Sequence, residues 1–339
     1  MSPLEQAAPA QAVTRVPQKS IVSISIIIPA LNEEKMIGRC LESLVKLDFE
    51  DGRFEVIVVD NGSRDNTLAI AESFKNKLDL KVLQQTGVRI SALRNLGAYA
   101  ALGDILAFLD ADCLPAEDWL KRILELAPRD GIGVVGAHYL LPEGSTWIGR
   151  TWHRYQEAPK SGEVSHIPAG DLIMRRADFL RLGGFDESIQ TNEDYELCDR
   201  VRKNGMQVRA FPSIGVVHLG TAQNLPVFFR KQAWHGTHVI KVFLRDVLKS
   251  HNRRAVSFAA YTLLCLFIAI AGTAWMLAGQ GTWLLPTLGA VALCLPPFAL
   301  AARQVLLSKR LSDFPPLFLL YLTYGIARAR SLLNIKNFF

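Results

Sequence analysis

Two long stretches without any charged residue stand near the carboxyl end of the chain, at 255–279 and 282–302. Each is long enough to cross a hydrocarbon core of about 30 Å as an α-helix that rises about 1.5 Å per residue. Within lipid, only helices and closed barrels satisfy all backbone hydrogen bonds, so both stretches are predicted to be helices. The short link Gln280–Gly281 makes them a helical hairpin. A pair of buried core helices is the alternative, and the length and lack of charge count against it.

Basic residues flank this hairpin on both outer sides and are absent from its link. Arg253 and Arg254 precede the first stretch, whereas Arg303, Lys309 and Arg310 follow the second. Segments rich in Lys and Arg stay on the cytosolic side of a membrane. The pattern therefore predicts an integral membrane protein. The outer ends of the hairpin and the large N-terminal part of the chain are expected to face the cytosol.

A third uncharged segment, 314–327, is shorter than the other two. If it crossed the membrane, Arg328, Arg330 and Lys336 would lie on the far side, against the same charge rule. A re-entrant or in-plane helix and a true span both stay open for this segment. Residues 255–339 are therefore predicted to form a transmembrane region with two spans and one segment of undecided placement.

The rest of the composition favours a membrane surface as a partner. Residues 226–254 mix aromatic and basic side chains, which predicts an amphipathic helix in the headgroup layer, with an ordinary packing helix as the alternative. The net charge is +6, and the basic residues cluster beside the apolar stretches, which disfavours nucleic acid as a partner.

Residues 1–21 lack an apolar signal-peptide core and are expected to be a disordered lead-in. The five cysteines include no CxxC pair, which indicates a reducing compartment.

In residues 22–225, apolar runs of strand length alternate with helix-like stretches. The runs are apolar on both faces, as expected for parallel strands covered by helices on two sides. Residues 132–220 alternate less cleanly and are expected to add mixed strands. The pattern predicts a doubly wound, Rossmann-like α/β domain with a mixed sheet. Its first four strands are predicted at 23–30, 54–60, 81–85 and 104–110, and its first helix at 32–47.

Polar residues gather where three of these strands end. Ligands of open α/β sheets bind beyond the carboxyl ends of the strands. Asn32 and Glu33 follow the first strand, Asp60 ends the second, and Asp110 and Asp112 follow the fourth. Side chains at positions i and i+2 of an extended segment point the same way, so the last two carboxylates are predicted to hold Mn²⁺ or Mg²⁺. Such an ion would bridge a diphosphate, and a simple helix cap is the alternative.

Glu193 and Asp194 open the helix-like stretch YELCDRVRKNG. A carboxylate at a helix start is stabilised in its charged form by the helix dipole. The pattern fits a plain N-cap, and it also fits a general base that deprotonates an acceptor hydroxyl.

Six motifs follow one another through residues 23–220: IIIPALNEE, VIVVDNGSRDNT, ALRNLGAY, LAFLDADC, LGGFDE and NEDYELCDRVRKNG. The ordered set resembles glycosyltransferase family 2, whose members have the GT-A fold. This resemblance implies inverting transfer of a sugar from a nucleotide-diphospho-sugar, usually with a divalent metal. UDP is the commoner nucleotide among such relatives, so a UDP-sugar is the expected donor here, and GDP- and dTDP-sugars stay open.

The resemblance also implies roles for individual residues. Asp194 corresponds to the catalytic base. Asp112 and Asp110 correspond to the metal site, with His218 as a further ligand or, alternatively, a structural histidine. The residues expected at the donor nucleotide are Pro29, Ala30, Asn32, Glu33, Asp60, Arg94 and Asp110. The residues expected on the acceptor side are Gly184, Phe185, Asp186 and Glu193, and Trp234 is a candidate for stacking on an acceptor sugar or for a membrane-interface position.

Processive polysaccharide synthases of this family carry a QxxRW motif near the membrane. The corresponding stretch here reads Gln232-Ala233-Trp234-His235-Gly236, so we expect transfer of a single sugar rather than polymerisation. A tethered site is at high effective concentration toward lipid-borne acceptors, which predicts a lipid-linked glycan at the cytosolic face of a bacterial inner membrane. Two alternatives stay open: a hexosyltransferase that makes a polyprenyl-phosphate sugar, and a catalytically inactive membrane scaffold.

Overall fold

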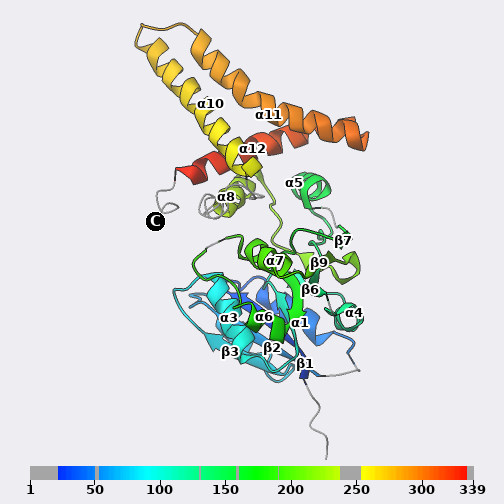
Figure 1. Cartoon of the computed structure of the whole chain (residues 1–339). Helices are drawn as coiled ribbons and strands as arrows, with labels where there is room; N and C mark the ends of the chain where they lie inside the picture. Colours follow the sequence, from blue (N-terminus) through cyan, green and yellow to red (C-terminus); the bar gives the residue numbers. More distant parts are fainter. Residues whose placement is uncertain are drawn as a thin grey trace, which may run out of the picture.

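The computed structural model describes residues 22–49, 53–129, 131–157, 160–189, 191–236 and 253–333. It has a part built around a β-sheet and a part built of long helices, which Figure 1 shows at the bottom and the top. The predicted lead-in, residues 1–21, lies outside the described residues, as do residues 237–252 of the predicted interfacial segment.

The strands of the N-terminal part form one large sheet and one small sheet. They are β1 (Val22–Ala30), β2 (Arg53–Asp60), β3 (Leu80–Gln84), β4 (Ile105–Leu109), β5 (Cys113–Leu114), β6 (Ile132–Gly136), β7 (Gly162–Glu163), β8 (Asp171–Arg175), β9 (Gln207–Ala210) and β10 (Val217–His218). The large sheet has the order β3-β2-β1-β4-β8-β6-β9-β7, and β5 pairs with β10 in the small one. Strands β1 to β4 are parallel, whereas β8 is antiparallel to β4 and β6. The predicted mixed sheet is confirmed.

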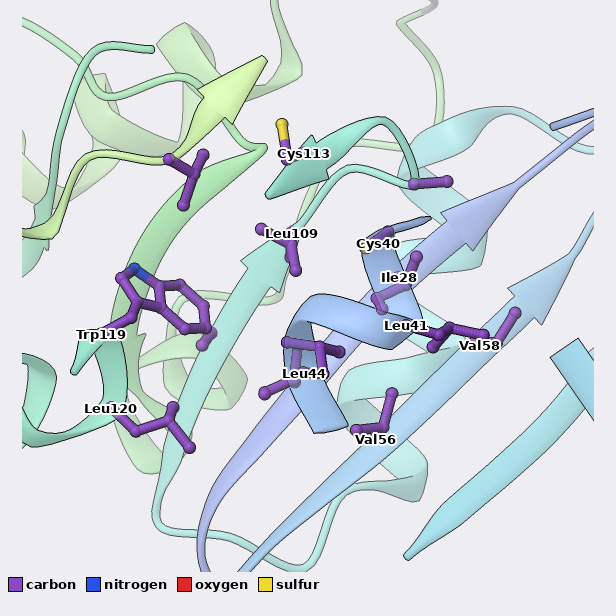
Figure 2. Close-up of a cluster of buried hydrophobic side chains, with 14 of the residues drawn as sticks. Ile28, Cys40, Leu41, Leu44, Val56, Val58, Leu109, Cys113, Trp119 and Leu120 are labelled. Carbon is purple, nitrogen blue, oxygen red and sulfur yellow. The ribbon is translucent and has the colours of Figure 1, made fainter. Parts of the chain in front are cut away.

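Helices cover both faces of the large sheet and create two hydrophobic cores. They are α1 (Ile37–Val45), α2 (Thr67–Glu72), α3 (Ile90–Ala100), α4 (Trp119–Leu126), α5 (Trp147–Trp152), a π-helical turn (His153–Glu157), α6 (Arg176–Arg181), α7 (Glu193–Lys203) and a 3-10 turn (Pro212–Ile214). Side chains alternate along β1, so Ile26 and Ile28 join the core under α1 and α4, whereas Ile27 joins the core under α3. Figure 2 shows the first core, with Leu41 and Leu44 of α1 lying over the strands.

A carboxyl group is fully buried in the middle of the large sheet. Asp171 begins β8 opposite Leu109 of β4, and none of its surface is exposed. Burial raises the pKa of Asp171 well above its usual range, although the Trp119 side chain and two backbone N–H groups oppose the rise. The folded protein therefore keeps the proton of Asp171 to a higher pH than the unfolded chain does.

The substitution Asp171→Asn is expected to raise Tm, and the gain should grow with pH. Between the pKa of Asp171 in the unfolded chain and its pKa in the folded protein, only the unfolded chain carries the ionised carboxylate. The free energy of unfolding of wild type therefore falls by about 1.4 kcal/mol for each pH unit in this range. An amide does not ionise, so this loss of stability disappears. Thermal unfolding near pH 5 and near pH 8 tests this, with Asp199→Asn, at a partly exposed carboxylate of α7, as a control. A gain that is equal at both pH values would contradict a neutral buried carboxyl.

Long helices make up the C-terminal part. They are α8 (Leu225–His235), α10 (Arg253–Leu277), α11 (Leu284–Ser308), a 3-10 turn (Leu311–Asp313) and α12 (Phe314–Leu332). Helices α10 and α11 pack on each other as the predicted hairpin (Figure 1). Among the described residues, these two helices are long and apolar enough to cross a membrane. Only 22% of the most apolar stretch of α10 and 17% of that of α11 is buried, which differs from helices in a soluble core.

Helix α12 runs crosswise between the hairpin and the sheet-containing part (Figure 1). It packs against α5 and α8 as well as against the hairpin. The ring of Trp152 in α5 lies 4.9 Å from that of Phe228 in α8 and 5.6 Å from that of Tyr324 in α12. Just beyond α5, Arg154 Nη1 lies 2.6 Å from the carboxylate of Asp313. Aromatic packing and an ion pair thus dock the helical part on the N-terminal part.

Candidate active site

The loops after β1 and β2 are tied together by hydrogen bonds. Ser63 Oγ accepts from the backbone N–H of Asn32 at 2.9 Å, and Asn32 Oδ1 accepts from the N–H of Arg64 at 2.9 Å. Thr67 Oγ1 accepts from the N–H of Glu33 at 2.7 Å. Asn32 has a φ of +55°, a region that asparagine tolerates better than most residues. Helix α1 begins at Ile37 and not at the predicted residue 32, because the backbone after β1 forms hydrogen bonds with the loop after β2.

Asp60 ends β2 and shapes the loop that follows. It pairs with Ala30, which follows Pro29 at the end of β1. Its Oδ2 accepts from the N–H groups of Gly62 and Ser63 at 2.8 and 3.0 Å, and the Ser63 hydroxyl donates to Oδ1. The buried carboxylate of Asp60 therefore fixes the loop at the predicted nucleotide side of the sheet.

Asp110 follows β4 and is held by two donors. Arg94 Nη2 donates to its Oδ1 at 2.7 Å, and the Tyr139 hydroxyl donates to its Oδ2 at 3.0 Å. A Cβ atom at position 170 would overlap Oδ2, so Gly170 permits this close approach. Both oxygens of Asp110 thus already have a partner within the protein.

Arg94 of α3 joins Asp110 to Glu193 at the start of α7. Its Nη1 donates to Glu193 Oε1 at 2.6 Å, and its guanidinium lies 5.6 Å from the centroid of the Phe185 ring. Burial lowers the pKa of Arg94, but the two carboxylates raise it by more, so the side chain stays charged. Burial raises the pKa of Glu193 to about 7, with the Asp194 charge adding to the rise and Arg94 opposing it.

Asp194 lies in the first turn of α7 and belongs to the same network. Its Oδ1 accepts from the N–H of Tyr195 at 2.7 Å, and its Oδ2 accepts from the N–H of Ala169 at 3.3 Å. Burial raises the pKa of Asp194 despite the hydrogen bond from Tyr195, and the charge of Asp110 adds to the rise. Ala169 directly precedes Gly170, which touches Asp110. One loop therefore brings the carboxylates of Asp194 and Asp110 together.

Asp112 pairs with His218, and the distance from its Oδ2 to Nε2 is 3.2 Å. The short β5–β10 ladder sets this pairing, because Cys113 lies opposite His218. Burial raises the pKa of Asp112, but His218, Lys231 and a backbone hydrogen bond together lower it by more, so the carboxylate is charged at neutral pH. The side chains of Asp112 and His218 remain 20% and 24% exposed, within reach of an ion.

This group of side chains fits a divalent metal ion. One ligand atom from each of Asp110, Asp112 and Cys113 lies within 4.8 Å of the others. The Cys113 sulfur is a soft ligand, which suits Mn²⁺ or Mg²⁺ less well than carboxylate oxygen does. The remaining carboxylates, with the imidazole of His218, are the oxygen and nitrogen donors that suit Mn²⁺.

Two further residues of this site were missed by the sequence reasoning. The Tyr139 ring stacks on His218 with centroids 4.5 Å apart, while its hydroxyl holds Asp110. Lys231 of α8 donates to the carbonyl oxygen of Gly220. No motif marks either residue. Tyr139 follows a strand whose place in the sheet is set by long-range pairing, and Lys231 lies in the stretch interpreted as interfacial.

Some of the residues predicted for the acceptor side are buried, whereas others are exposed to solvent. Gly184 and Phe185 form a turn pinned by Asn95, whose amide exchanges two 2.9 Å hydrogen bonds with the backbone of Phe185. The Phe185 ring is buried, so it supports the network from the core rather than facing solvent. Asp186 is partly exposed, and Trp234 on α8 is 47% exposed. Of this set, Asp186 and Trp234 are the ones that solvent reaches.

A mixed sheet with carboxylates at the ends of β2 and β4 and at the start of α7 defines the class of GT-A glycosyltransferases. The chain belongs to glycosyl transferase family 2, whose model matches residues 25–183. It is 39% identical over 247 residues to the glycosyltransferase AglE of Haloferax volcanii, covering 71% of this chain and 80% of that protein. The resemblance seen in the motifs is thereby confirmed.

Two further comparisons concern a curated relative and a solved structure. The probable glycosyltransferase YdaM of Bacillus subtilis is 27% identical over 75% of this chain, and the match spans 64% of YdaM. The structure of the mannosyltransferase PcManGT from Pyrobaculum calidifontis aligns over 92% of this chain and 87% of that one, with a TM-score of 0.60 and 21% identity. This likeness establishes the fold.

Proposed function

We propose that this chain is an inverting, metal-dependent glycosyltransferase that moves a single sugar from a nucleotide-diphospho-sugar to an acceptor hydroxyl. The observation that carries the proposal is the network that joins Asp110, through Arg94, to Glu193 and its neighbour Asp194. It fixes a carboxylate of the candidate metal site relative to a candidate base from a distant part of the sequence.

Asp194 is the proposed base. Its carboxylate takes the proton of the acceptor hydroxyl while the hydroxyl oxygen attacks the anomeric carbon of the sugar. The bond from that carbon to the diphosphate oxygen breaks, and the nucleoside diphosphate leaves with the electron pair. Attack from the side opposite the leaving group inverts the anomeric centre. A positioned general base contributes about 10²- to 10⁴-fold to such a step.

The donor side is proposed to lie at the ends of β1, β2 and β4. Asp112 and His218, with Asp110 beside them, would hold Mn²⁺ or Mg²⁺. When bound, the ion neutralises charge on the diphosphate. The PcManGT structure is of a complex with GDP-Man and Mn²⁺, which supports a metal and favours keeping GDP-sugars as an alternative to the expected UDP-sugars.

The acceptor is proposed to be lipid-linked and to meet the site at the cytosolic face of a membrane. Apolar side chains are exposed along both hairpin helices, including Phe267 on α10 and Leu288 on α11. Exposed apolar surface of this extent is typical of contact with lipid or with a partner. The crosswise packing of α12 on α5 and α8 favours an in-plane helix over a third span.

A transfer assay on the full chain in detergent tests this proposal. UDP- and GDP-sugars are offered with Mn²⁺, and the acceptor is either a polyprenyl-diphosphate-linked glycan, a polyprenyl phosphate or the matching soluble glycan. We expect one donor to be used, EDTA to abolish transfer, and the lipid-linked glycan to exceed the soluble one by at least about tenfold, since tethering raises effective concentration.

Each other outcome has a distinct meaning. Equal use of lipid-linked and soluble glycans would remove the argument for a lipid acceptor. A preference for polyprenyl phosphate would favour the alternative hexosyltransferase. No transfer from any donor, with a folded protein, would favour the inactive scaffold.

A further inference from the structure

Lys231 projects from α8 into the group of charges around Asp112. Its Nζ donates to the backbone carbonyl of Gly220, two residues beyond His218. Burial raises the pKa of Glu33 to about 7, with Asp112 and Asp110 adding to the rise, and the Lys231 charge opposes it. Lys231 also helps to lower the pKa of Asp112. A side chain from outside the sheet-containing part thus acts on the candidate metal site.

The position of Lys231 is fixed by the packing of α8. The helix starts at Asn224, whose Oδ1 accepts from the N–H of Val227 at 2.9 Å. Phe228, one turn before Lys231, is buried against α5, and Gln232 is buried and accepts a 3.4 Å hydrogen bond from Arg328 of α12. Residues three and four apart share one face of a helix. Lys231 therefore stands on the packed side of α8 and is not a freely moving surface lysine.

Among the described residues, no carboxylate forms a salt bridge with Lys231. Arg94 is committed to Asp110 and Glu193 through both terminal nitrogens. His218 is committed to Asp112. The hydrogen-bond partner of Lys231 is a neutral carbonyl. An ammonium beside the metal-side carboxylates is therefore left able to meet an incoming anion.

Gly220 lies directly against Asp112 and His218. A Cβ atom at position 220 would overlap Asp112 Oδ2 and approach His218 Nε2 to 2.9 Å, so only glycine fits there. The carbonyl of Gly220 therefore holds Lys231 close to these side chains. The ammonium is thus a near neighbour of the candidate metal site.

We propose that Lys231 is a catalytic residue that binds the diphosphate of the nucleotide-sugar and stabilises its charge as it leaves. This inference rests on the proposed transfer from a nucleotide-sugar. Lysine serves well as a point charge for phosphate oxygens. Helix α8 lies beyond residues 25–183 matched by the family model and mostly beyond the domain boundary predicted at residue 225. The proposed active site thus includes α8, a helix that packs on α12 of the C-terminal part.

The test compares Lys231→Met with Arg230→Met in the full chain. Arg230 is the exposed neighbour on the same helix, so both variants lose one positive charge. Affinities are measured for the nucleoside diphosphate and monophosphate of the preferred donor, with Mn²⁺ and with EDTA. Lys231→Met should weaken diphosphate binding by about 10- to 100-fold, the range for a charged hydrogen bond, and should change monophosphate binding by less than about threefold.

Supporting results are unchanged affinities in Arg230→Met, recovery of diphosphate affinity in Lys231→Arg, and a lower kcat in Lys231→Met. If Lys231→Met lost the same affinity for both nucleotides and also had a lower Tm, the role of Lys231 would be only to stabilise the backbone at Gly220, which would overturn the proposal. Unchanged affinity for the diphosphate would overturn it as well. Failure of wild type to bind any nucleotide would instead refute the proposed function.

Discussion

The substitution Asp194→Asn is expected to lower kcat by about 10²- to 10⁴-fold while leaving donor affinity within about threefold of wild type. The amide has the size of the carboxylate and can keep the hydrogen bond from the N–H of Tyr195. It does not accept the proton of the acceptor hydroxyl, so the chemical step loses its base. Donor affinity should survive because the predicted nucleotide residues lie on other loops.

The pH dependence of kcat separates this role from a structural one. Burial raises the pKa of Asp194, so its carboxylate form is lost at a higher pH than that of an ordinary aspartate. Wild-type kcat should therefore decline on the acid side, and the residual activity of Asp194→Asn should not. Asp199→Asn, on the same helix but paired with Arg202, is the matched control and should behave as wild type. Retained turnover in Asp194→Asn would reject the base assignment.

The substitution Asp112→Ala is expected to abolish the gain in nucleotide affinity that Mn²⁺ gives to wild type. Asp112 pairs with His218, which is itself a candidate ligand, whereas the two oxygens of Asp110 are held by Arg94 and Tyr139, which are not candidate ligands. Loss of Asp112 also removes the partner of His218. Affinity for the nucleoside diphosphate in Mn²⁺ should fall by about 100-fold or more, since a bound ion supplies several kcal/mol of charge stabilisation.

Calorimetric titration with Mn²⁺ and with EDTA measures this effect. In EDTA, Asp112→Ala and wild type should bind the nucleotide with similar affinity, because neither then carries a metal. Asp104→Ala is the matched control, since Asp104 is exposed and precedes β4 at the end of the strand opposite Asp112. If Mn²⁺ still tightened nucleotide binding to Asp112→Ala, the metal would have to sit elsewhere.

The parallel half of the sheet could be predicted because each of its strands is recognisable from its own run of apolar residues. Runs such as residues 54–60 are apolar on both faces, and β2 is buried along most of its length. Parallel order then places the residues after β1, β2 and β4 at one edge without further information. Asp60, Asp110 and Asp112 could be assigned to one site for that reason.

The rest of the site depends on contacts that no local pattern encodes. Tyr139 reaches Asp110 because β6 inserts between β8 and β9, out of sequence order. Lys231 reaches Gly220 because α8 is held by α5 and α12. The Phe185 ring was predicted on the acceptor side, yet the turn pinned by Asn95 directs it into the core. Each outcome follows from packing between segments far apart in the chain.

The most direct measurement is a structure of the full chain with Mn²⁺ and a donor analogue that resists transfer, with the metal located by its anomalous scattering. The prediction is an ion within about 2.0–2.6 Å of the Asp112 carboxylate, a diphosphate between it and Lys231, and Asp194 facing the anomeric carbon from the opposite side. A metal bound away from Asp112, or Asp194 lying on the same side of the sugar as the diphosphate, would contradict the proposed reaction.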